Sequence, residues 1–199
     1  MTVFFHPYTD FLLIVGMMAQ GKTTITKHYC KSLKPLIAID PTWQLGEVGY
    51  CVHFPERILA AYQKFKKVIY QPKKMDTLTY QRAFQVCLSL INYTLVIDEI
   101  DTFAKPNWYK CDEVEQIIKR GRAQGIGIIG NTRRPANTHN DLKNNVYHVV
   151  CFKLHGKSDV DYMSEWLNID KMEIKGLQKY HSLYYNVTEG TVTKQAPLY

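Results

Sequence analysis

The stretch FLLIVGMMAQGKT, residues 11–23, decides the fold of this chain. Its second part, GMMAQGKT at residues 16–23, fits the Walker A pattern G-x-x-x-x-G-K-[ST]. Its first part is a short apolar run typical of a buried central strand, and the residues that follow favour a helix. Because the pattern lies between a strand and a helix, as a phosphate-binding loop requires, it predicts a P-loop.

Each residue type in the loop has a physical role. Glycines let backbone N–H groups close around a phosphate, Lys22 places a cation on the β- and γ-phosphates, and the hydroxyl of Thr23 is a ligand for Mg²⁺. The helix that starts here adds the positive end of its dipole. We therefore expect a nucleoside triphosphate, with ATP as first choice, to be bound by Gly16, Met17, Met18, Ala19, Gln20, Gly21, Lys22, Thr23 and Thr24.

A second motif, LVIDE at residues 95–99, resembles a Walker B segment. An apolar strand would bring Asp98 to its C-terminal tip, where the carboxylate helps to hold Mg²⁺. Glu99 follows directly and is placed to orient and deprotonate an attacking water. Two adjacent acids after a phosphate loop favour a hydrolase over a kinase. Asp101 is interpreted as a cap of a loop or helix and not as a third catalytic acid.

Along the rest of the chain, predicted strands alternate with predicted helices. Apolar runs predict strands over 11–15, 35–40, 67–72, 94–101, 125–132 and 146–154. Helical periodicity, caps and prolines predict helices over 22–33, from 55, from 76, over 112–120 and over 158–167. The tail predicts a β-hairpin that turns at Glu189-Gly190. This order indicates an α/β fold with a mostly parallel central sheet flanked by helices, in a single domain over 1–199.

Composition narrows the class of protein. With 46% apolar and 22% charged residues, the chain is neither disordered nor fibrous. Its net charge of +7 modestly favours a polyanionic partner such as nucleic acid. The five cysteines form no C-x-x-C pair, which argues against a zinc site. The longest apolar stretch, residues 11–19, is about half of what a membrane span needs, so we expect no membrane insertion.

Two further positions bear on hydrolysis. The strand GIGIIGNT ends in polar residues where a sensor of the γ-phosphate would lie. Just upstream, Arg120 falls in the last turn of a helix, where a base can simply complement the helix terminus. Arg122 lies beyond that helix and is the better candidate for an arginine finger, a residue that completes the site of a neighbouring subunit.

RGRAQGIGIIGNTRRP at residues 120–135, followed by LKNNVYHVVCFKLHGKSDVDYM at 142–163, resembles the FtsK–HerA superfamily of DNA-pumping ATPases. The small size is most similar to genome-packaging ATPases of membrane-containing icosahedral DNA viruses, the tectivirus and vaccinia type. The resemblance covers about residues 11–162. One position departs from it, because Arg133 stands where the family has a sensor Gln. Arg133, Asn131 and Thr132 all stay candidates for the sensor.

The resemblance implies a RecA-like P-loop fold and a motor that hydrolyses ATP with Mg²⁺ at the interfaces of a homo-oligomeric ring, a hexamer or a pentamer. It implies double-stranded DNA and capsid vertex proteins as partners, genome packaging into a preformed capsid as the function, and the host cytoplasm and the virion as locations. Its catalytic residues would be Lys22, Glu99 and Arg122.

Two alternatives stay open. A small P-loop kinase would lack the adjacent catalytic Glu and would need no arginine from a neighbour. A nucleotide-dependent assembly switch would bind the triphosphate with negligible turnover. The segment FAKPNWYK, residues 103–110, mixes Lys105 and Lys110 with Trp108 and Tyr109, so it either faces DNA or covers the core.

Overall fold

The computed structural model describes residues 5–198. The described strands are β1 (Phe11–Val15), β2 (Leu36–Ile39), β3 (Tyr50–Val52), β4 (Lys67–Tyr70), β5 (Tyr93–Ile97), β6 (Ala104–Lys105), β7 (Trp108–Tyr109), β8 (Ile126–Thr132), β9 (His148–Phe152), β10 (Ser182–Asn186) and β11 (Thr191–Gln195). The described α-helices are α1 (Lys22–Ser32), α2 (Ile58–Phe65), α3 (Thr77–Leu88), α4 (Asp112–Arg120), α5 (Asn140–Asn145), α6 (Lys157–Leu167) and α7 (Lys171–Lys175).

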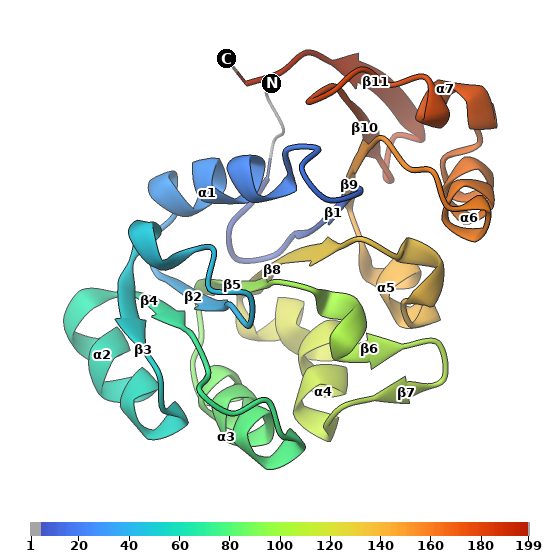
Figure 1. Ribbon diagram of the computed structural model, residues 1–199. Helices are drawn as coiled ribbons and strands as arrows, with labels where there is room; N and C mark the ends of the chain where they lie inside the picture. The colour runs from blue at the N-terminus through green and yellow to red at the C-terminus, as the bar shows by residue number, and fades with distance from the viewer. Residues whose placement is uncertain (1–4, 199) are drawn as a thin grey trace.

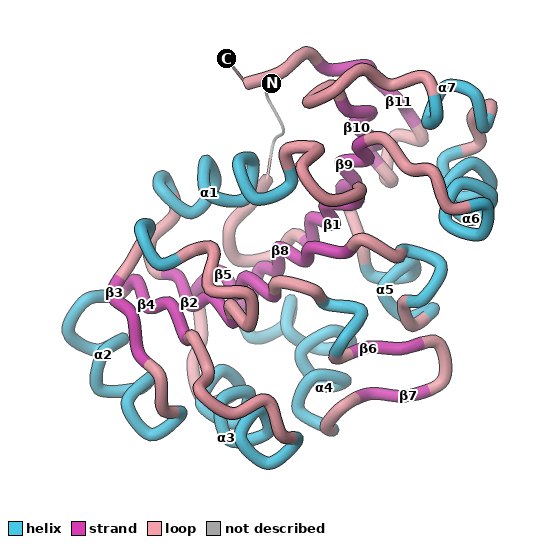
Figure 2. Tube along the Cα trace, in the orientation of Figure 1, coloured by secondary structure: helices cyan, strands magenta, loops and turns pink. Residues whose placement is uncertain are grey.

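Nine of the described strands form one sheet in the order β11-β10-β9-β1-β8-β5-β2-β4-β3 (Figures 1 and 2). The strands from β9 to β3 pair in parallel, whereas β10 is antiparallel to both β9 and β11. The remaining two, β6 and β7, form a separate small hairpin. The α/β fold with a mostly parallel sheet and a C-terminal hairpin is therefore confirmed.

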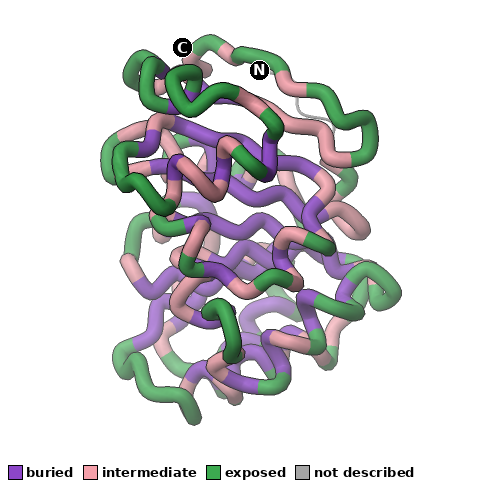
Figure 3. Tube along the Cα trace, turned by 90° about the vertical axis from the view of Figure 1, so that its right-hand side faces the viewer, coloured by how far each residue is buried: buried purple, intermediate pink, exposed green. Residues whose placement is uncertain are grey.

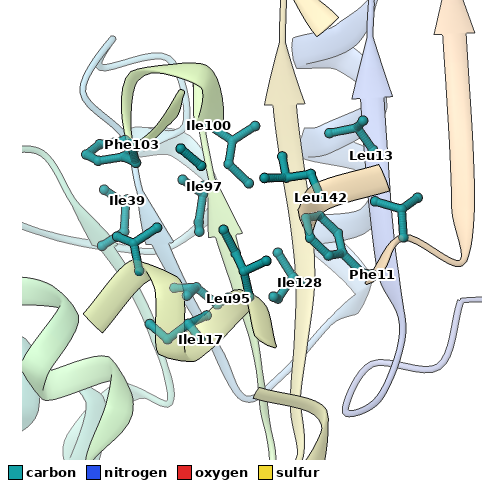
Figure 4. Close-up of a cluster of buried hydrophobic side chains, with 14 of the residues drawn as sticks. Phe11, Leu13, Ile39, Leu95, Ile97, Ile100, Phe103, Ile117, Ile128 and Leu142 are labelled. Carbon is teal, nitrogen blue, oxygen red and sulfur yellow. The ribbon is translucent and has the colours of Figure 1, made fainter. Parts of the chain in front are cut away.

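Helices cover both faces of the sheet. On one face, Leu12 and Ile14 belong to a buried cluster that includes Ile25 of α1. On the other face, Leu13 belongs to a second cluster that includes side chains of α3, α4 and α5. The central strands β1, β2, β5, β8 and β9 are accordingly buried along their whole length (Figure 3). The second face carries the larger apolar cluster, from Phe11 through Ile128 to Leu142 (Figure 4). A strand buried on both faces has no polar alternation, which explains the unbroken run FLLIV.

Most predicted elements form within a few residues of their expected bounds, and α4 begins at Asp112 and ends at Arg120 as predicted. The fourth strand is an exception, because it ends at Ile97 and not at residue 101. Glu99 has a left-handed backbone with a φ of 52°, which cannot continue a strand, and a short 3₁₀ turn over Ile100–Thr102 follows. Five of the described strands and α-helices were not predicted: β3, β6, β7, α5 and α7.

Within residues 5–198, no helix is long and apolar enough to cross a membrane. The predicted single domain over 1–199 includes residues 1–4 and 199, which lie outside the described residues, so its extent stays a prediction.

Candidate active site

Three parallel strands deliver the candidate residues to one edge of the sheet. β8 lies between β1 and β5, so the ends of all three are neighbours. The P-loop follows β1, the acids Asp98 and Glu99 follow β5, and Asn131 and Thr132 end β8. The carboxyl ends of parallel strands are where ligands bind in open α/β sheets.

The P-loop has the backbone that its glycines predict. Gly21 has a φ of 113°, in the left-handed region that favours glycine. A Cβ on Gly16 would lie 2.6 Å from the Cβ of Phe152, so only glycine fits where the loop leaves β1. The ammonium of Lys22 donates to the backbone oxygens of Gly16 at 2.6 Å and Met17 at 2.8 Å. The loop therefore wraps around this cation.

The environment of Lys22 disfavours its charged form. Burial and, next in size, the positive charge of Arg133 lower the pKa of Lys22 from 10.5 to about 8, although Asp98 and Glu99 act in the opposite direction. A negatively charged ligand at this position would restore the charge on the ammonium.

The oxygen donors around Thr23 and Asp98 suit Mg²⁺. The Thr23 hydroxyl donates to Gln44 Oε1 at 2.8 Å, and the Thr42 hydroxyl donates to Asp98 Oδ2 at 2.5 Å. Hydroxyl, carboxylate and amide oxygens are the ligands that this hard cation prefers. The residues present therefore fit a magnesium ion, which Thr23 and Asp98 would hold, the latter through water.

Thr42 and Gln44 were not predicted as site residues. They belong to a loop after β2 that is held by the buried carboxylate of Asp40, which accepts the backbone N–H groups of Gln44 at 3.0 Å and Leu45 at 2.9 Å. In the sequence, the feature that could have indicated this loop as part of the site was Asp40 at the tip of an apolar strand. Because β2 pairs with β5, that tip lies beside Asp98.

Asn131 connects the two nucleotide motifs. Its Nδ2 donates to Asp98 Oδ1 at 3.0 Å, and its Oδ1 accepts the hydroxyl of Thr26 in α1 at 2.9 Å. The neighbouring Thr132 hydroxyl donates to Asp101 at 2.8 Å. Burial raises the pKa of Asp101. Asp101 thus secures the end of β8, in agreement with its interpretation as a structural acid.

Arg133 reaches the predicted base. Its Nη2 lies 2.5 Å from Oε1 of Glu99. Together the site residues surround a cavity of about 60 Å³, which is lined by Met18, Ala19, Lys22, Thr23, Gln44, Asp98, Glu99, Asn131, Thr132 and Arg133. The structure therefore brings most of the predicted catalytic, metal and phosphate residues to one place.

Some residues of the P-loop face away from this cavity. Thr24 and Gly21 line a second, smaller cavity against Tyr180 and Leu198 on the other side of the loop. Among the described residues, the side-chain oxygen of Gln20 is buried and has no hydrogen-bond partner.

Arg122 lies at the opposite end of the sheet. It precedes β8, donates to the hydroxyl of Tyr147, and its guanidinium carbon lies 4.8 Å from the centre of the Tyr147 ring. The seven residues of β8 span about 20 Å between Arg122 and the cavity, at roughly 3.3 Å per residue. Arg122 does not reach the site of its own chain.

The β6–β7 hairpin joins the segments that follow Glu99 and Arg133. The hydroxyl of Tyr109 donates to Asp141 Oδ2 at 2.8 Å, and its ring stacks on His139 with the centroids 4.3 Å apart. The backbone N–H of His139 donates to the oxygen of Ala104 at 2.9 Å. Lys105 and Trp108 at the hairpin tip are exposed, and Lys105 Nζ lies 5.5 Å from the Trp108 ring centre.

No protein-family model and no curated protein matches the sequence. Solved structures do match the fold. The genome packaging NTPase B204 from Sulfolobus turreted icosahedral virus 2, in complex with ATP-gammaS, has a TM-score of 0.82 and 18% identity over 96% of this chain and 98% of that chain. B204, the DNA-packaging ATPase from Sulfolobus turreted icosahedral virus, has a TM-score of 0.75 and 19% identity over the same shares.

A more distant match is VirB4 of Thermoanaerobacter pseudethanolicus, with a TM-score of 0.66 and 10% identity over 94% of this chain and 90% of that chain. At these identities the similarity establishes the fold. Over nearly its whole length the chain therefore has the P-loop fold of the viral genome-packaging NTPase B204, which is the fold that the resemblance to FtsK–HerA packaging ATPases predicted.

Proposed function

We propose that this protein is an ATP-hydrolysing motor that moves double-stranded DNA. The convergence of Lys22, Thr23, Asp98 and Glu99 on one cavity carries the proposal. These side chains come from two motifs far apart in sequence, and each has the chemistry that phosphoanhydride hydrolysis requires.

Each residue has one task in this proposal. Lys22 and the P-loop amides bind the β- and γ-phosphates of ATP. Thr23 and Asp98 would hold Mg²⁺, which neutralises phosphate charge when it is bound. Glu99 accepts a proton from the attacking water at a carboxylate oxygen, for which its ion pair with Arg133 must first loosen. Arg133 then offers its cation to the γ-phosphate.

Arg122 would act on a neighbouring subunit. It is exposed and lies at the end of the sheet opposite its own cavity, so it serves catalysis only where two copies meet. This arrangement supports a homo-oligomeric ring, for which a hexamer and a pentamer are both compatible with the resemblance.

We infer DNA and the capsid as partners from the similarity to packaging ATPases. The net charge of +7 and the exposed Lys105 and Trp108 beside the active-site strands suit a sequence-independent grip on phosphates. Genome packaging at a capsid vertex, in the host cytoplasm and in the virion, is the biological role that we propose.

ATP hydrolysis measured with and without duplex DNA tests the proposal. We expect turnover that rises when DNA is added and is lost in Glu99→Gln, which retains ATP binding. Transfer of phosphate to a small acceptor without any effect of DNA would indicate a kinase instead. Tight ATP binding with negligible turnover under both conditions would indicate an assembly switch.

A further inference from the structure

A groove of about 380 Å³ lies at the β3 edge of the sheet, and none of the residues that line it also lines the active-site cavity. β3 pairs with β4 on one side, and none of the other described strands pairs with its second side. The groove runs between β3 and α2, and its aromatic and charged side chains are Tyr50, His53, Phe54, Glu56, Arg57, Lys64 and Phe65.

Aromatic side chains gather at this groove and remain exposed. Tyr50 is 49% exposed and stacks on Phe65 with the ring centroids 4.0 Å apart, and Phe54 is 47% exposed. At the rim, Trp43 is 51% exposed and stacks on His53 at 5.0 Å. Single exposed apolar side chains are ordinary on a protein surface, whereas a contiguous group around a groove indicates a binding site.

The same segment carries a strong local positive charge. Residues 54–74 contain one acid, Glu56, which lies 3.9 Å from Arg82. The same residues include six cations, Arg57, Lys64, Lys66, Lys67, Lys73 and Lys74. Of these, Lys67 does not face the groove, because its ammonium donates to the backbone oxygens of Cys30 and Lys31 in α1. Lys73 lies 5.4 Å from the centre of the Phe54 ring, and Lys64 lies 5.2 Å from that of Phe65. Arg57, Lys64 and Lys73 therefore each lie against an aromatic ring of the groove.

We propose that this groove binds a single strand of nucleic acid. Cations that track a phosphate backbone, interleaved with aromatic rings on which bases stack, are the elements of sequence-tolerant single-strand binding. A duplex keeps its base faces stacked inside and presents only base edges, so it cannot use the rings. The charge excess argues for a polyanion over a purely apolar partner.

The site goes beyond the proposed motor function and does not depend on it. The hairpin tip with Lys105 and Trp108 belongs to a different part of the molecule, and the residues of the groove take no part in the proposed hydrolysis. Trp43 shares its loop with Thr42 and Gln44, so the groove adjoins the nucleotide site without including it.

Fluorescence anisotropy of a labelled oligothymidine of about 15 nucleotides tests the proposal without nucleotide. We expect Phe54→Ala to weaken binding by about fivefold or more, because one base loses its stacking partner. Arg57→Ala with Lys64→Ala should reduce the salt slope of log affinity by about 0.7 for each phosphate that the variant no longer neutralises. A blunt-ended duplex of equal length should be insensitive to Phe54→Ala.

The matched control is Lys175→Ala with Lys194→Ala, which removes the same charge from exposed positions near the opposite sheet edge. It should leave oligothymidine affinity within about twofold at constant salt. An equal loss of affinity in this control, or an affinity unchanged by the groove variants, would overturn the proposal. Concentration-dependent self-association abolished by Phe54→Ala, with no oligothymidine binding, would instead identify the groove as an interface between copies.

Tryptophan fluorescence separates this site from the hairpin. In a Trp108→Phe chain the remaining exposed indole is that of Trp43, because Trp166 is only 8% exposed. Oligothymidine should quench this emission, and further replacement by Trp43→Phe should abolish the quenching. Quenching that persists in the Trp43→Phe, Trp108→Phe chain would overturn the assignment. Failure of DNA-stimulated hydrolysis alone would contradict the motor function and leave the groove unaffected.

Discussion

The guanidinium of Arg133 forms an ion pair with the carboxylate of Glu99, with Nη2 and Oε1 2.5 Å apart. Glutamine, the residue of the resembling family at this position, could donate a hydrogen bond there but could not neutralise the carboxylate. In this chain the predicted base is therefore engaged by a cation, and the pair must rearrange before Glu99 can face a water.

Arg133→Ala tests whether this cation also serves the reaction. Arg133 lines the cavity, so its loss should remove charge stabilisation from the transition state and lower kcat by about 10²- to 10³-fold. Steady-state ATPase assays measure this change. Arg134→Ala is the matched control, because Arg134 is exposed and is not among the residues that line the cavity. An unchanged kcat in Arg133→Ala would move the sensor role to Asn131 or Thr132.

The lowered pKa of Lys22 predicts that ATP binding weakens as the pH rises above about 8. Below about pH 8 the ammonium is charged in the free chain, whereas above it the free lysine is increasingly neutral and must take up a proton as phosphate binds. Affinity should therefore fall above about pH 8, by up to about tenfold per pH unit.

Calorimetry at about pH 8.5 in two buffers of different ionisation enthalpy measures this uptake. We expect about three-quarters of a proton for the wild-type chain, because Lys22 is about three-quarters neutral at this pH, and none for Lys22→Met where its binding can still be measured. A wild-type chain that takes up no proton would contradict the lowered pKa of Lys22.

The positions of the two Walker motifs were predicted correctly from the sequence. Each motif follows a buried strand, β1 or β5, and both the glycine conformations of the loop and the burial of these strands depend on residues that are close in sequence. The pairing of Glu99 with Arg133 and the contacts of Gln44 and Thr42 were not predicted. They depend on the order β1-β8-β5-β2, which brings together strand ends that are distant in sequence.

Short elements were missed for a related reason. β3 has only three residues and the strands of the β6–β7 hairpin have two each, too few to show an alternating pattern. Their formation depends on tertiary contacts, such as the pairing of β3 with β4 and the bond from Tyr109 to Asp141.

Arg122→Ala should leave ATP affinity nearly intact and slow hydrolysis by about 10³- to 10⁵-fold, the value of an arginine finger. ATP affinity should not depend on Arg122, because the whole length of β8 separates this residue from the active-site cavity of its own chain. Mixing this variant with Glu99→Gln subunits should restore some activity, since an intact Arg122 then meets an intact Glu99. Arg120→Ala is the control, and no recovery in mixed assemblies of verified composition would contradict a finger at Arg122.

Tyr109→Phe should weaken the connection between the hairpin and the segment that follows Arg133, although the backbone bond from His139 to Ala104 remains. It removes the hydroxyl that donates to Asp141 while it keeps the ring on His139. Basal hydrolysis should persist, whereas stimulation by duplex DNA should fall by about 2- to 30-fold, the range for couplings of about 0.5–2 kcal/mol. Tyr185→Phe on β10, away from the hairpin, should change neither rate. Equal stimulation in Tyr109→Phe and wild type would show that the bond from Tyr109 to Asp141 does not couple DNA binding to hydrolysis.

Lys105→Ala combined with Lys110→Ala tests whether the hairpin grips duplex DNA. Lys105 is the last residue of β6 and lies against Trp108, whereas Lys110 directly follows β7 and its Nζ lies 5.0 Å from the centre of the Tyr80 ring. Duplex affinity should fall about equally for all sequences, and the slope of log affinity against log salt should decrease by roughly 0.9 for each phosphate that an engaged subunit no longer neutralises. Hydrolysis without DNA should be nearly unchanged, because neither lysine lines the active-site cavity. A salt slope equal to that of the wild type would exclude this hairpin and direct attention to Lys143 and Arg134, beyond the end of β8.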